Sequence, residues 1–118
     1  MRDDTVYLRH ILDAIGKIEE YISGLKRDTF FARTMIQDSV IRQIEIIGEA
    51  TKRLSSELRE AHDSIPWQDM AWMRDKLIHD YFGVNLEEVW LTVQNDIPVL
   101  KKEIAQILHE INGKQSPA

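Results

Sequence analysis

The 118-residue sequence contains no cysteine, three prolines and five glycines, and it has no apolar run of the roughly 18 residues that a transmembrane helix needs. The lack of cysteine excludes disulfides, thiolate nucleophiles and thiolate metal sites, and it fits a reducing compartment. The first residues have no apolar stretch after their charged positions, so we expect no signal peptide and a cytoplasmic location.

The chain also lacks an excess of positive charge, because its formal net charge is −5. Phosphate neutralisation supplies most of the affinity of stable nucleic-acid binders, so the acidic balance counts against tight, extended RNA or DNA binding. The acidic net charge does not exclude an enzyme that contacts a few phosphates at one site. With 43% hydrophobic and 30% charged residues the chain reads as one globular domain, placed at residues 1–112, followed by a frayed tail at 113–118.

Apolar residues recur at steps of three and four, and no segment alternates with period two, so the fold class is predicted to be all-α. Helices are expected over residues 5–23, 29–58 and 67–81, and then from 86 onward. Asp3 or Asp4 can cap the first helix, Gly24 can stop it, and Asn85 can cap the fourth. Pro98 kinks or splits the fourth helix. A split after Asn95 is preferred, with Asp96 capping a last helix that ends near residue 111.

The long second helix carries apolar residues on more than one side, which predicts packing against more than one partner and a self-associating surface. Its main stripe is Ile36, Val40, Ile44, Ile47, Thr51, Leu54 and Leu58, with Ile41 and Ile46 beside it. Gly48 lies inside this helix, where glycine costs about 1 kcal/mol against alanine. Close approach of another helix, or a site that needs room, would explain it.

Residues 74–81 combine Arg74, His79 and Tyr81 in the pattern R-x4-H-x-Y on a predicted helix. Arginine keeps its charge, whereas histidine exchanges a proton near neutral pH. In RNA cleavage, histidine can act as general base or acid while a guanidinium holds the phosphate and stabilises its developing charge, with no metal required. The pattern therefore indicates a metal-independent nuclease site. Asp75 lies one turn before His79 and can orient its ring.

Helical geometry separates the two predicted catalytic side chains. Arg74 and His79 lie about 140° apart around a regular helix, so one straight helix does not easily aim both at one phosphate. The arginine stem could bend, the helix could become irregular near Gly83, or two copies could meet across a two-fold axis and form composite sites. The third option is the most economical.

Structural roles compete with the catalytic interpretation. Arg74 could pair with Asp75, Asp80 or Glu49 on a solvated face, and Tyr81 could be a boundary aromatic. Glu49 could instead face the motif and support Arg74. The other histidines lack ligand spacing, so we expect no metal and no cofactor.

The motif and its surroundings resemble the HepT-like toxins of the HEPN superfamily, over roughly residues 4–111. Several segments carry the resemblance in the same order as in that family: Ile46–Ala50, Ile65–Trp67, Met73–Val84, Leu86–Trp90 and Asp96–Leu100.

The resemblance implies a HEPN-type antiparallel bundle of four to five helices that forms a homodimer. It implies the toxin of a type II toxin-antitoxin system, an endoribonuclease that cleaves RNA with Arg74 and His79 in a cleft at the dimer interface. It further implies a minimal nucleotidyltransferase antitoxin as partner, which would AMPylate Tyr81 and block the nuclease. The alternatives are a non-catalytic HEPN module that binds such a nucleotidyltransferase, and a purely structural dimerisation bundle.

Overall fold

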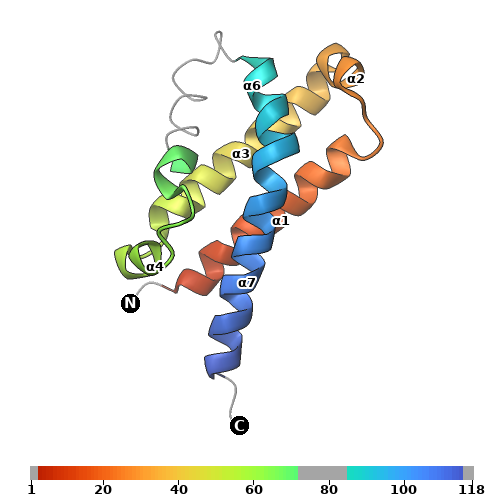
Figure 1. Cartoon of the computed structure of the whole chain (residues 1–118). Helices are drawn as coiled ribbons and strands as arrows, with labels where there is room; N and C mark the ends of the chain where they lie inside the picture. Colours follow the sequence, from red (N-terminus) through yellow and green to blue (C-terminus); the bar gives the residue numbers. More distant parts are fainter. Residues whose placement is uncertain (1–2, 72–84, 116–118) are drawn as a thin grey trace.

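The computed structural model describes residues 3–71 and 85–115 (Figure 1). Within these ranges every regular element is helical, so the all-α prediction is confirmed. No described helix is both long enough and apolar enough to cross a membrane. Dimerisation and the limits of the domain stay predictions.

The first helix, α1 (Asp4–Ile22), forms as its apolar spacing predicts. Asp3 caps it by accepting a hydrogen bond from the Thr5 backbone N–H at 3.1 Å. Gly24 ends the segment with a φ of 73°, a left-handed conformation that favours glycine. The buried face of α1 consists of Leu8, Ile11, Ala14, Ile15 and Ile18.

The core lies between α1, α3 (Thr34–Arg53) and α7 (Ile97–Gln115). The most extensive contact joins α1 to α3, which run antiparallel, and α7 crosses α1 (Figure 1). Val40, Ile44 and Ile47 supply the α3 side of the core, and Ile104 and Ile107 supply the α7 side. One cluster of buried side chains therefore holds all three helices.

The prediction of a single long helix over residues 29–58 is wrong at the start of that range. The chain instead forms α2 (Arg27–Ala32), breaks at Arg33 and begins α3 at Thr34. Arg33 is extended, with φ −118° and ψ 97°. The buried Gln37 side chain donates hydrogen bonds to the Phe30 and Phe31 carbonyls at 2.9 and 3.0 Å. These bonds satisfy carbonyls that lose their helical donors at the break, while Phe30 enters the core.

A second break ends α3 before residue 58. Leu54 is fully buried and extended, and Ser55 caps a short helix, α4 (Ser56–Ala61), by accepting from the Leu58 N–H at 3.1 Å. Asp4 of α1 accepts from the Ser55 N–H at 2.8 Å and its hydroxyl at 2.6 Å. The predicted polar loop at 59–66 therefore begins inside a helix that a distant carboxylate positions.

The C-terminal half contains one continuous helical path. Asn85 caps α6 (Leu86–Leu91) as predicted, but the expected split after Asn95 is wrong. A π-helical turn, η2 (Thr92–Asp96), leads directly into α7, and the Ile97 N–H donates to the Thr92 carbonyl five residues back. The wider turn lies just before Pro98, whose ring lacks an N–H and would crowd a regular turn. Asp96 is thus within the helix, which continues to Gln115 instead of ending near residue 111.

The third predicted helix, residues 67–81, starts where Pro66 indicates. Residues 67–71 are helical, and the Pro66 carbonyl accepts from the Met70 N–H at 3.2 Å. Trp67 is buried and donates its indole N–H to the His62 carbonyl at 3.0 Å. The remainder of the predicted helix lies outside the described residues.

We expect Gln37→Leu to lower the free energy of unfolding by about 2 kcal/mol, because the Phe31 carbonyl loses the Gln37 donor and the Phe30 carbonyl keeps its 3.3 Å bond from the Arg33 N–H but loses its shorter one. Chemical denaturation followed by circular dichroism would measure it. Gln106→Leu is the matched control, since the Gln106 amide bonds only Glu110 at an exposed site and its loss should cost under about 0.5 kcal/mol. Equal effects of the two substitutions would contradict the role assigned to Gln37.

Candidate functional site

The predicted catalytic and modified residues Arg74, Asp75, His79 and Tyr81 lie outside the described residues. The structure instead shows how the two ends of their segment, residues 72–84, are held. The helical turn at 67–71 enters the segment, and the Asn85 cap follows it. The structure therefore defines the two residue ranges that flank the predicted site, 67–71 before it and Asn85 onward after it.

The entering turn is fixed to the core. Trp67 is buried with 6% of its surface exposed, and its hydrogen bond to the His62 carbonyl satisfies the one polar group of the indole. Met70 packs against the core cluster. The helical turn at 67–71 that precedes the motif thus has a defined position beside α3.

The leaving end is fixed by a cap and by contact with α2. The Asn85 side-chain oxygen accepts from the Glu87 and Glu88 backbone N–H groups at 3.0 and 3.3 Å. Glu87 forms an ion pair with Arg27 of α2, whose guanidinium lies 4.5 Å from the centre of the Phe31 ring. The hydrogen bond to Glu87 raises the pKa of Arg27 above its usual value. Both side chains are about half exposed, so the pair orients α6 more than it stabilises the fold.

Glu49, the predicted supporting residue, lies in a polar cluster between α1 and α3. Its carboxylate accepts from the Arg53 Nε at 3.3 Å, and Tyr7, His10 and Arg42 line the same surface hollow. Hydrogen bonds to Tyr7 and then to Glu49 raise the pKa of Arg53. The i, i+4 spacing of Glu49 and Arg53 was a signal for this ion pair that the sequence interpretation did not use. Pairing of Glu49 with Arg74 stays a prediction.

Two further residues, Trp90 and Gly48, pack inside the fold. The ring of Trp90 packs at a tilt against Phe30 with ring centres 5.1 Å apart, and Gly48 is buried within α3. Trp72 lies outside the described residues. Within residues 3–71 and 85–115, no group of three histidine or carboxylate side chains is placed to hold a metal ion.

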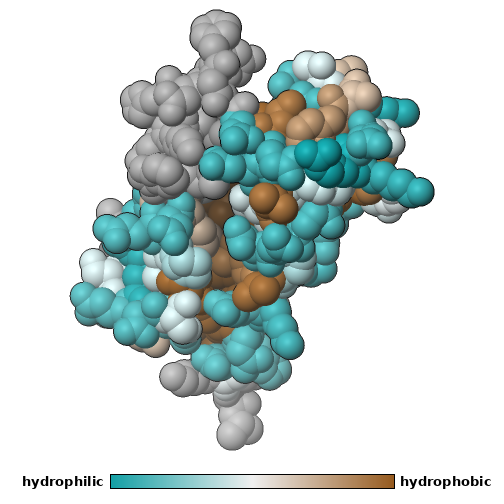
Figure 2. Space-filling model, turned by 45° about the horizontal axis from the view of Figure 1, so that its top comes forward, coloured by the Kyte–Doolittle hydropathy of each residue, from teal (hydrophilic) through white to brown (hydrophobic). Residues whose placement is uncertain are grey.

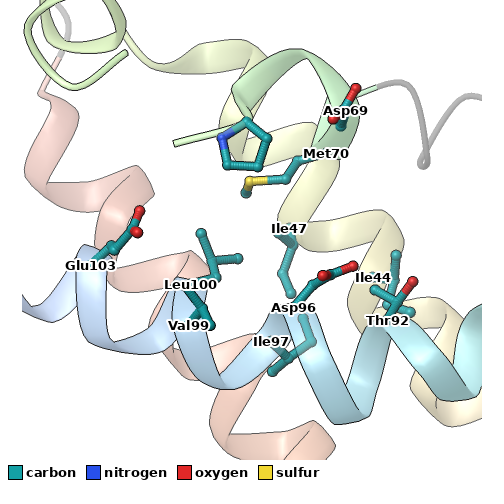
Figure 3. A pocket seen from close by; sticks show the side chains of 11 residues that line it. Ile44, Ile47, Asp69, Met70, Thr92, Asp96, Ile97, Val99, Leu100 and Glu103 are labelled. Atoms are coloured by element: carbon teal, nitrogen blue, oxygen red, sulfur yellow. The ribbon is translucent and has the colours of Figure 1, made fainter. Parts of the chain in front are cut away.

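Sequence reasoning missed an apolar groove beside the helical turn at residues 67–71. The groove measures about 270 Å³ and lies between α3, residues 66–71 and the η2–α7 path (Figure 3). Figure 2 shows hydrophobic surface in a hollow on this face, bordered by hydrophilic residues. Three elements far apart in the sequence form the groove, so no local sequence pattern predicts it. Its lining is Ile44, Ile47, Pro66, Asp69, Met70, Thr92, Asp96, Ile97, Val99, Leu100 and Glu103.

Comparison with known proteins identifies the family. The family described as "Ribonuclease HepT-like" matches residues 11–107, most of the chain. The chain belongs to the HepT-like family. The matched span includes residues 72–84, so the R-x4-H-x-Y motif lies inside the HepT-like region, as the sequence resemblance predicted.

Three HepT-like relatives illustrate the similarity. A Methanocaldococcus jannaschii protein named "Gamma-glutamylcyclotransferase and putative RNase" is 50% identical over 98% of this chain, but the chain spans only 52% of that protein. "Probable ribonuclease HepT" of Thermococcus cleftensis is 45% identical, over 86% of this chain and 92% of its own length. "Putative RNase" of Caldanaerobacter subterraneus subsp. tengcongensis is 41% identical, over 93% and 98%. No solved structure matches the chain.

Proposed function

We propose that this chain is a metal-independent endoribonuclease that uses Arg74 and His79. The observation that carries the proposal is the HepT-like match over residues 11–107, with the R-x4-H motif inside it. Relatives that align over nearly their full length are named as ribonucleases. The acidic net charge of −5 fits an enzyme that holds a few phosphates at one site better than an extended RNA-binding surface.

The chemistry assigns a role to each motif residue. A neutral His79 removes the proton of an RNA 2′-hydroxyl, whose oxygen attacks the adjacent phosphorus while the bond to the 5′-oxygen breaks. The protonated form of a histidine then returns a proton to the leaving oxygen. Arg74 balances the charge that builds on the phosphate oxygens, and Asp75 orients the imidazole as a positioning residue.

The site is proposed to lie at the interface of a homodimer. The angular separation of about 140° between Arg74 and His79 on a helix is bridged when each copy supplies one of the two groups. Apolar residues on several sides of α3 support a further contact with a second copy.

Regulation is proposed to act through Tyr81. A cognate minimal nucleotidyltransferase antitoxin would transfer AMP from ATP to the phenol oxygen, with pyrophosphate as the leaving group. The adenylate adds negative charge and bulk where a polyanionic substrate must enter. In this scheme the protein is the toxin of a toxin-antitoxin pair and acts in the cytoplasm. The acidic net charge also fits a second candidate function, that of a non-catalytic module that binds the nucleotidyltransferase.

Arg74→Ala and His79→Ala should each reduce RNA cleavage by about 10²- to 10⁴-fold, because each removes a group that acts in the transition state. Gel analysis of a labelled RNA with purified protein would measure the rate, with and without EDTA. Arg9→Ala and His109→Ala remove the same residue types at exposed positions on α1 and α7 and should leave the rate unchanged. Undiminished cleavage by either motif variant would refute the catalytic assignment, and loss of cleavage in EDTA would refute metal independence.

Mixing the two inactive variants tests the composite site. If Arg74 and His79 come from different copies, a mixed dimer of Arg74→Ala and His79→Ala subunits keeps one intact site of two. A randomly exchanged equimolar mixture then recovers about a quarter of wild-type cleavage. If both residues act within one subunit, no mixture recovers activity, and the interface proposal fails while the nuclease proposal stands.

Co-expression with a minimal nucleotidyltransferase of the proposed antitoxin class should add mass to the protein in AMP units and suppress its cleavage of RNA. Tyr81→Phe should remove the added mass, because phenylalanine lacks the acceptor oxygen. Tyr21→Phe is the control, since Tyr21 is a half-buried tyrosine of α1 that packs on the core. Modification that persists in the Tyr81→Phe protein would overturn the assignment of Tyr81.

A further inference from the structure

The apolar groove beside the helical turn at residues 67–71 has no role in the proposed cleavage. Ile44 and Ile47 of α3 form one wall, Ile97 and Leu100 form the other, and Met70 closes the top (Figure 3). At about 270 Å³ it is slightly smaller than the roughly 300–1,000 Å³ of sites that enclose a small molecule. Its size and open form suit a few apolar side chains of a partner instead.

The rim of the groove is acidic. Asp69, Asp96 and Glu103 are its charged lining residues, and no lysine or arginine of the described chain lines it. Among described residues, no hydrogen bond or ion pair engages these three carboxylates, in contrast to Glu19, which pairs with Lys101 at 3.0 Å. Their negative charge complements a cationic partner.

The wall formed by α7 has a regular pattern that a helix can match. Asp96 and Glu103 are seven residues apart, which is two helical turns or about 10.5 Å along the axis. Val99 and Leu100 lie between them on the same side, and 57% of the Val99 surface is exposed. The π-helical turn ends at Asp96, and π-helical turns in α-helices frequently occur at functional sites.

We propose that this groove binds an amphipathic, basic helix of a partner protein. The partner helix carries two lysines or arginines seven residues apart, which meet Asp96 and Glu103, and apolar residues three and four positions after the first, which enter the groove. Asp69, on the helical turn at 67–71, adds attraction for the same basic face. Binding here is independent of the nuclease activity.

The probe is a synthetic, fluorescently labelled helical peptide of about 14 residues with that pattern, two lysines flanking two leucines on an alanine-rich background. Its control has glutamates in place of the lysines. Fluorescence anisotropy with the full chain should show at least tenfold tighter binding of the lysine peptide. That preference should shrink when NaCl rises from about 0.05 M to about 0.5 M, because salt screens exposed charges.

Variants of the chain locate the binding. Asp96→Asn with Glu103→Gln should weaken the lysine peptide about three- to tenfold, since two partly exposed ion pairs are lost. The matched control is Asp13→Asn with Glu20→Gln, an exposed Asp–Glu pair also seven residues apart but on α1, and it should change nothing. Val99→Asp should weaken binding more than tenfold, whereas Val6→Asp, at a comparably exposed valine of α1, should not.

Three results would overturn the proposal. Equal affinity for the lysine and glutamate peptides, or equal effects of the groove variants and their α1 controls, would exclude a basic helix in this groove. Sedimentation tests whether a second copy of the chain occupies the groove instead. The groove would be assigned to a second copy if the wild-type chain self-associates and does not bind the peptide, and if Val99→Asp dissociates it whereas Val6→Asp does not. Circular dichroism of each variant establishes that the helical fold is retained.

Discussion

The packing of α1 on α3 is the contact on which the rest of the structure depends. Leu8, Ile11, Ile15 and Ile18 are fully excluded from solvent, and each such side chain contributes about 1.5–3 kcal/mol by leaving water. The neighbouring elements attach to this pair by particular bonds. Asp4 of α1 holds the start of α4 through Ser55, and Gln37 of α3 holds the end of α2.

These attachments determine where the motif segment begins and ends. Residues 67–71 enter it beside α3 with Trp67 buried, and Asn85 caps the helix that follows it. Arg27 links α6 back to α2, so both ends of the segment rest on the same core. A site confined to one short segment needs no large basic surface, which fits the net charge of −5.

In the two proposals, the motif serves RNA cleavage and the groove serves binding of a partner helix. The motif supplies a fixed positive charge and a titratable ring, which suit a phosphodiester. The groove supplies apolar depth and three carboxylates, which suit a basic protein helix and repel a polyanion. Under the two proposals, surfaces of opposite charge would serve RNA cleavage and partner binding separately, because neither ligand would compete well for the other surface.

The sequence by itself determined the helical class, the start and stop of α1, the Asn85 cap and the HepT-like family, because these depend on local spacing, caps and motifs. It also named the motif residues Arg74, His79 and Tyr81, whose arrangement lies outside the described residues. Only the tertiary structure decided the breaks at Arg33 and Leu54, because a distant carboxylate and burial of Phe30 and Leu54 outweigh local helix propensity there. It also decided that the chain passes Pro98 through a π-helical turn, and that Ile47, Met70 and Leu100, from three separate segments, share one groove.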